Sequence, residues 1–137
     1  MKIFFDTSSL CKKYFEESGS ISLLALIQEA SEIIISPLTW VELNSAPSRR
    51  IREGSLSRQQ VSHLMLEAKR DFYSFHVVIW NQTLEETAAE IVYKYSLSTL
   101  DAIQLASGIH SEADEFVSSD KKLLKEAGKV LEKTRFI

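Results

Sequence analysis

Two acidic residues directly follow short apolar runs that are typical of buried β-strands. Asp6 comes after Lys2–Phe5, and Asp120 comes after Glu115–Ser118. A carboxylate in such a place either caps the next helix or belongs to a site at the carboxyl end of a sheet. Both interpretations stay open at this point.

Two further acids lie in stretches with helical patterns. Glu42 is part of TWVELNSA, and Asp101 is part of LSTLDAIQLASGIH, where it shares a helical stripe with Leu105 and Gly108. Glu42 can be an ordinary surface residue, and Asp101 can complete a capping box that starts at Ser98. A carboxylate on an apolar stripe raises the question of what compensates its charge.

The elements that must position these acids alternate between short strands and helices. Apolar strands separated by helices predict an α/β fold, with a parallel sheet covered on both faces. The expected strands are Lys2–Phe5, Ile33–Ile35, Val77–Ile79 and Glu115–Ser118, with a fifth that begins near Val130–Leu131. The expected helices cover about 6–17, 21–30, 37–46, 57–72, 83–95, 98–110 and 121–127.

Several helix boundaries have local signals. Capping boxes are predicted at Ser57 and Thr83, Ser36 before a proline is a good helix start, and Pro47 is expected to break or kink its helix. The helix over 21–30 is apolar nearly all round, which predicts that it is buried.

In this arrangement the four acids converge. Parallel strands end at one edge of the sheet, so the first turns of the following helices bring Asp6, Glu42, Asp101 and Asp120 into one pocket. Four anions repel one another in a low dielectric, and a divalent cation is the economical compensation. Ligands that are all oxygen suit Mg²⁺ or Mn²⁺ rather than Zn²⁺, and the three histidines show no metal-ligand spacing.

Hydroxyl residues accompany two of the acids. Ser8 lies two residues after Asp6, and Ser118 lies two residues before Asp120. Their hydroxyls can orient a carboxylate, a water or a phosphate oxygen, or they can simply begin helices.

Composition limits the classes of protein to consider. The chain has 137 residues, and we expect a single domain over 1–137. A net charge of −3 does not favour general nucleic-acid binding, so such contacts would need local basic patches.

One cysteine, Cys11, permits no disulfide within the chain and is expected to be a small buried hydrophobe. The chain has neither a signal-peptide pattern nor a run long enough to span a membrane, so we expect a cytoplasmic protein without membrane association.

Four motifs in this order and at these spacings resemble the PIN-domain ribonucleases. The motifs are DTSSLCKKYFEESGS after the first strand, ISPLTWVELNSA, LSTLDAIQLASG and FVSSDKKLL. The resemblance covers essentially the whole chain. It is to the VapC-type toxins of VapBC toxin–antitoxin modules, and it implies a PIN-like three-layer domain with about five parallel strands in the order 3-2-1-4-5.

The resemblance also implies roles for individual residues. The acidic quartet of the family falls on Asp6, Glu42, Asp101 and Asp120, and its supporting polar positions fall on Ser8 and Ser118, where threonine is commoner at the latter. Relatives often carry arginine three residues before the third acid, whereas this chain has Ser98. That difference puts a basic group there in doubt and leaves the quartet complete.

An endoribonuclease that depends on Mg²⁺ or Mn²⁺ follows from the resemblance. A metal ion held by carboxylates lowers the pKa of a bound water, which can attack phosphorus in line. We expect Asp6 and Asp101 to bind the ion directly, and Glu42 and Asp120 to hold metal-bound waters or to complete a second metal site. Either Glu42 or Asp120 can be the general base, and cleavage should leave a 3′-hydroxyl and a 5′-phosphate. The implied partners are RNA, a VapB-type antitoxin and a second copy of the chain in a homodimer.

An acidic protein needs local cations to hold RNA. The densest basic cluster is Arg49, Arg50 and Arg52, and Lys121 directly follows Asp120. We expect phosphate contacts from these residues, although ordinary surface exposure is the alternative. Two further functions stay open, a housekeeping RNA-processing nuclease and a non-catalytic module that binds nucleic acid or a partner.

Overall fold

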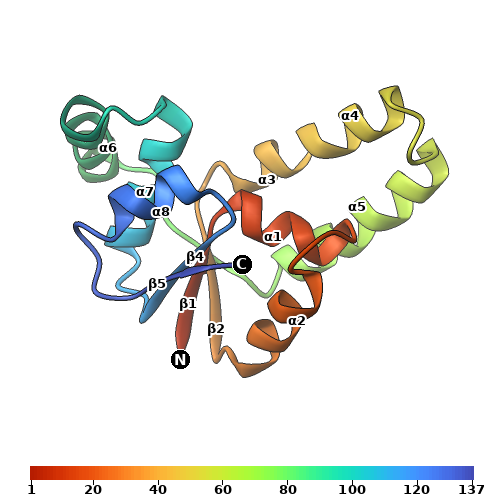
Figure 1. Cartoon of the computed structure of the whole chain (residues 1–137), viewed down its shortest axis with the longest axis horizontal. Helices are drawn as coiled ribbons and strands as arrows, with labels where there is room; N and C mark the ends of the chain where they lie inside the picture. The colour runs from red at the N-terminus through yellow and green to blue at the C-terminus, as the bar shows by residue number, and fades with distance from the viewer.

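Five parallel strands form the central sheet of the computed structural model, which describes residues 1–137 (Figure 1). The strand order is β3-β2-β1-β4-β5, as the resemblance implied, and every neighbouring pair is parallel, as the sequence pattern predicted. The expected third and fifth strands are displaced along the chain, because strand limits depend on pairing with a neighbour. The strands are β1 (Lys2–Phe5), β2 (Glu32–Ile35), β3 (His76–Val77), β4 (Glu115–Ser118) and β5 (Thr134–Phe136).

Helices cover both faces of the sheet and complete the three layers. In Figure 1, α6, α7 and α8 lie on one side and α1, α2 and α5 on the other. Helix α4 and the beginning of α5 form an arm that extends away from the sheet. No helix is both long and apolar enough to cross a membrane. The helices are α1 (Thr7–Tyr14), α2 (Ser20–Glu29), α3 (Thr39–Leu43), α4 (Ser45–Arg52), α5 (Arg58–Phe72), α6 (Gln82–Tyr95), α7 (Thr99–His110) and α8 (Lys121–Ala127).

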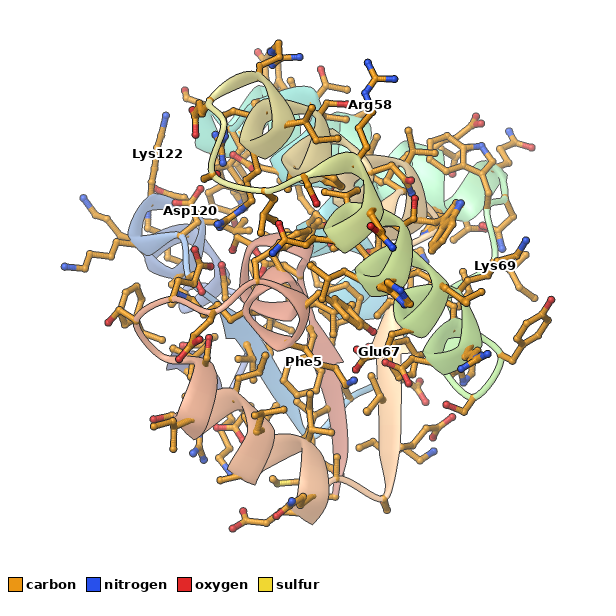
Figure 2. The ribbon with its side chains drawn as sticks, turned by 90° about the vertical axis from the view of Figure 1, so that its right-hand side faces the viewer. Phe5, Arg58, Glu67, Lys69, Asp120 and Lys122 are labelled. Carbon is orange, nitrogen blue, oxygen red and sulfur yellow. The ribbon has the colours of Figure 1, made fainter.

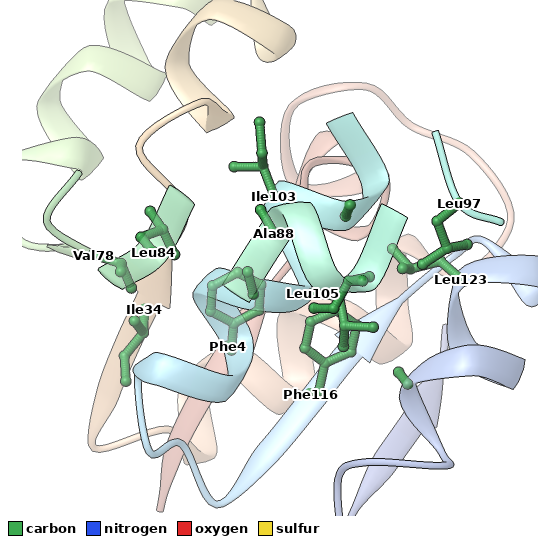
Figure 3. Packing of buried hydrophobic residues seen from close by; sticks show 14 residues of the cluster. Phe4, Ile34, Val78, Leu84, Ala88, Leu97, Ile103, Leu105, Phe116 and Leu123 are labelled. Atoms are coloured by element: carbon green, nitrogen blue, oxygen red, sulfur yellow. The ribbon is translucent and has the colours of Figure 1, made fainter. Parts of the chain in front are cut away.

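The alternation of side chains along β1 divides the core into two hydrophobic clusters. Phe4 points into the cluster beneath α6, α7 and α8, whereas Ile3 and Phe5 point into the cluster beneath α1 and α2. All three are fully buried. Phe4 stacks on Phe116 of β4 with ring centroids 5.1 Å apart, which ties the central strands to one layer (Figure 3).

Several helix boundaries differ from the sequence predictions. Helix α3 begins at Thr39, with Leu38 as its N-cap, rather than at Ser36 and the proline that follows it. The break expected at Pro47 is present but lies earlier, because α3 ends at Leu43 and α4 begins at Ser45. Pro47 itself lies in the first turn of α4, where backbone N–H groups have no partner within the helix.

The N-cap of α6 lies two residues before the predicted Thr83, since Asn81 takes that place and accepts a hydrogen bond from the Leu84 N–H at 2.9 Å. The capping box at Ser57 is present as predicted.

The prediction that the second helix is buried is wrong for part of its surface. Leu23 and Leu26 of α2 are buried against the sheet, but Ile21 is 86% exposed and Leu24 is 43% exposed. A helix that is apolar all round can be buried on every side, but the sequence does not show how many sides have neighbours. In this fold, neighbouring elements cover only one side of α2.

A glycine allows α7 to pack directly on the sheet. A Cβ atom at Gly108 would lie 2.5 Å from Cδ2 and 2.7 Å from Cε2 of Phe116. Asp101 lies two turns earlier on the same helix, so this close approach also determines where Asp101 stands relative to the strand ends.

The substitution Gly108→Ala should therefore destabilise the protein by about 1–3 kcal/mol, because the added methyl group overpacks against Phe116. Urea denaturation measures the change in the free energy of unfolding. Gly128→Ala is the matched control, since its Cβ would meet its nearest atom at 3.4 Å, and it should change stability by less than about 0.5 kcal/mol. Equal denaturation midpoints for the two variants would contradict this account of the packing.

Candidate active site

Three of the four sequence-predicted acids follow strands at the carboxyl edge of the sheet. Asp6 lies between β1 and α1, Asp120 lies between β4 and α8, and Glu42 lies in α3, which follows β2. Asp101 is in the first turn of α7. Figure 2 shows Asp120 at the start of α8, above the sheet and beside Lys122.

Asp6 is the buried centre of this region. Only 3% of its surface is exposed, and it caps α1 by accepting a hydrogen bond from the Ser9 N–H at 2.9 Å. The Ser8 hydroxyl donates to both carboxylate oxygens, at 2.9 and 2.8 Å, and the Ser118 hydroxyl donates to Oδ2 at 2.7 Å. Burial raises the pKa of Asp6, and these hydrogen bonds oppose the shift without cancelling it.

The two predicted polar residues connect α1 to the loop before α8. Ser118 is fully buried, donates to Asp6 and accepts a hydrogen bond from the Asp120 N–H at 2.9 Å. Ser8 accepts from the Ser119 N–H at 3.1 Å. The first and fourth acids are thus held in a common network by short hydroxyl side chains.

Glu42 is held by residues from two other helices. Its Oε1 atom accepts hydrogen bonds from the Thr7 hydroxyl at 2.9 Å and from Nε2 of Gln104 at 2.5 Å. Gln104 was not among the residues selected from sequence, although a polar residue one turn after Asp101 in an apolar helix is a detectable signal. Both hydrogen bonds reach the same carboxylate oxygen, so Oε2 receives neither.

The pKa of Asp101 depends on its burial and on charged neighbours. Partial burial raises the pKa of Asp101, the Ser98 hydroxyl lowers it, the negative charge of Asp120 raises it further, and Lys122 opposes that effect. The N–H of Asp101 also donates to the Ser98 hydroxyl at 3.2 Å, as expected for the N-cap of α7. Asp120 accepts from the N–H groups of Lys122 and Leu123 and caps α8.

The atom types at this edge of the sheet suit a divalent cation, but the acids do not form a complete set of ligands. None of the four acids forms an ion pair, whereas elsewhere the buried Glu115 pairs with Arg135 at 2.8 Å. No three His, Cys, Asp or Glu side chains lie close enough together to hold one ion. The side-chain atoms around Asp6 that could bind a metal ion are, however, all oxygens. The hydroxyls of Ser8 and Ser118 can rotate their hydrogen atoms away from the carboxylate.

A pocket of about 450 Å³ opens beside Glu42 and Ser8. Arg49 and Arg52 line it, and neither forms an ion pair. Cys11 also lines it, and burial raises the pKa of this thiol to about 12, so the side chain stays a neutral thiol.

Two other basic residues selected from sequence make contacts within the protein. The guanidinium of Arg50 lies over the Phe15 ring, 4.7 Å from its centroid, and 3.5 Å from the Glu17 carboxylate. The Lys121 ammonium lies over the Phe136 ring at 5.4 Å. The pocket beside Glu42 therefore includes Arg49 and Arg52 but not Arg50 or Lys121.

The family model of the PIN domain matches residues 3–130. The chain belongs to the PIN-domain family. A comparison with curated proteins found no match.

Solved structures share this PIN fold over most of their length. A toxin–antitoxin complex from Klebsiella pneumoniae is 20% identical with a TM-score of 0.67, over 88% of each chain. VapC20 from Mycobacterium tuberculosis, a toxin that cleaves the sarcin-ricin loop, is 18% identical with a TM-score of 0.70, over 90% of this chain and 93% of that one. VapBC2 from Rickettsia felis, bound to a DNA fragment from its promoter, is 12% identical with a TM-score of 0.72, over 100% and 99%. At these identities the likeness establishes the fold.

The network around Asp6 gives a stability prediction for this PIN domain. Ser118→Ala removes a donor to a buried carboxylate and the acceptor for the Asp120 N–H, so it should lower the free energy of unfolding by about 1–3 kcal/mol. Ser118→Thr keeps the hydroxyl and should lose clearly less. Urea denaturation tests both, with Ser62→Ala on the exposed face of α5 as the control. If Ser118→Ala behaved like the control, the hydroxyl would not support Asp6.

Proposed function

We propose that this PIN domain is a metal-dependent endoribonuclease and the toxin of a type II toxin–antitoxin pair. The observation that carries the proposal is the placement of Asp6, Glu42, Asp101 and Asp120 at one edge of the sheet, none of them neutralised by an ion pair. Membership of the PIN family supports nuclease chemistry. The toxin role rests on the similarity to structures of toxin–antitoxin complexes.

Asp6 and Asp101 would hold a Mg²⁺ or Mn²⁺ ion, with Asp120 beside them. When bound, the ion would supply charge neutralisation at the phosphate and a lower pKa for the attacking water. Ser8 and Ser118 orient Asp6, and burial of this carboxylate strengthens its attraction for a cation because it is poorly solvated.

Glu42 is our candidate for the general base. Its Oε1 atom is occupied by Thr7 and Gln104, so Oε2 can accept the proton of a water that attacks phosphorus. Attack breaks the bond from phosphorus to the 3′ oxygen, which leaves as a 3′-hydroxyl after taking a proton from solvent, while the phosphate stays on the 5′ side. Arg49 and Arg52 line the same pocket and would bind the RNA phosphates.

A protein antitoxin and a second copy of the chain are the proposed partners. Ile21 and Leu24 on α2 and Trp40 and Val41 on α3 are apolar and 36–86% exposed, which suits them to a protein interface. We expect the antitoxin to cover the acidic edge and to suppress cleavage when it is bound.

Purified protein should cleave RNA with Mg²⁺ or Mn²⁺ and stop in EDTA. Asp6→Asn and Asp101→Asn should each lower the cleavage rate by at least about a hundredfold, because they remove charge that the transition state requires. Gel analysis of labelled RNA, with end-group mapping, measures the rate and the products. Glu132→Gln, an exposed acid away from the site, is the control. Full activity of either aspartate variant would refute the mechanism.

The basic pocket predicts how cleavage responds to salt. Replacing Arg49 and Arg52 together by alanine should lower kcat/KM about tenfold at low salt and reduce the slope of log(kcat/KM) against log[salt] by about 1.4, since each lost phosphate contact contributes about 0.7 on a single strand. Arg70→Ala, an exposed arginine in the last turn of α5, should leave the slope unchanged. An unchanged slope in the double variant would assign RNA binding to another surface.

A further inference from the structure

Gln104 is a buried polar residue that the mechanism above leaves without a function of its own. It lies one turn after Asp101 in α7, and only 3% of its surface is exposed. Its neighbours along the helix, Ile103 and Leu105, belong to the hydrophobic core. A glutamine in such surroundings must be held by specific hydrogen bonds.

The side chains of Gln104, Thr7 and Glu42 form a network of three hydrogen bonds. Its Nε2 atom donates to the Thr7 hydroxyl oxygen at 2.9 Å and to Glu42 Oε1 at 2.5 Å. The Thr7 hydroxyl donates its own hydrogen to the same Glu42 oxygen at 2.9 Å. The amide must turn its Nε2 atom toward Glu42, because in the flipped orientation its oxygen would face the carboxylate and repel it.

This orientation leaves the other end of the amide without a partner. Oε1 of Gln104 is buried and accepts no hydrogen bond. A buried acceptor without a donor is destabilising, and an apolar side chain of similar shape would avoid that penalty. Packing in the core therefore does not explain a glutamine here, whereas a requirement for an N–H group directed at Glu42 does.

We propose that Gln104, together with Thr7, is a positioning residue that holds the Glu42 carboxylate by Oε1 and so directs Oε2 to the substrate pocket. This inference rests on the proposed function of Glu42 as general base. The residue acts through Glu42 and does not touch the RNA. Removing it lets the carboxylate change its rotamer, which lowers the fraction of molecules in the reactive geometry without weakening RNA binding.

Kinetics of Gln104 variants test the proposal. Gln104→Met keeps the shape but has no donor, and it should lower kcat by about tenfold or more while KM for RNA stays within about twofold. Gln104→His keeps an N–H at a similar reach and should recover part of the loss. The same ordering is expected for Thr7→Val and Thr7→Ser. Melting temperatures of all variants are measured to confirm that each is folded at the assay temperature.

A double-mutant cycle shows whether the effect passes through Glu42. In a Glu42→Gln background, Gln104→Met should change the residual rate by less than about twofold, because the group it positions is already disabled. A full additional loss there, a loss that falls on KM, or equal activity of the methionine and histidine variants would overturn the proposal.

A spectroscopic measurement separates this inference from the proposed function. In ¹⁵N NMR spectra, the Gln104 amide protons, assigned by their absence in Gln104→Met, should be shifted downfield and exchange slowly, and Glu42→Gln should move them. If the protein cleaved no RNA but showed this signature, the proposed function would fail while the contact stood. If it cleaved RNA and the signature were absent, the positioning role would be refuted.

Discussion

The rest of the site depends on keeping one carboxylate, that of Asp6, almost entirely out of water. A buried charge is tolerated only when hydrogen bonds replace its hydration, and here the donors are two serine hydroxyls and the first turn of α1. These donors come from two segments, the first turn of α1 and the end of β4, and Ser118 lies 112 residues from Asp6 along the chain. Satisfying Asp6 therefore also fixes how β1, α1 and the end of β4 meet.

The sheet makes that meeting rigid. Fully buried Ile3, Phe4 and Phe5 anchor β1 to both helical layers, and the close contact of Gly108 with Phe116 seats α7 on the neighbouring strand. The acids stand at the ends of these well-packed elements rather than on long loops. A site built on such supports keeps its side chains in place without contacts to the substrate.

Stability is given up at several points around the acids. Burial raises the pKa of Asp6 and of Asp101, and Gln104 keeps a buried oxygen without a donor. By contrast, Glu115 at the opposite end of β4 is equally buried but is neutralised by Arg135. Uncompensated polar groups that gather at one edge of a fold are what a binding or catalytic site requires, because a ligand can supply the missing partner.

The sequence by itself determined the alternation of buried strands and helices and the sheet edge that Asp6 and Asp120 follow, because buried strands and helix starts leave strong local patterns. The strand order came from the resemblance to PIN domains. The contacts of Gln104, the packing of Arg50 on Phe15 and the exposure of Ile21 depended on the tertiary structure. The first two are contacts between segments that are far apart along the chain, and Ile21 is exposed because no distant segment covers it. Local periodicity does not indicate which distant residue will lie next to a given side chain. Residue spacing therefore selected the candidate carboxylates, whereas packing decided which neighbours hold them.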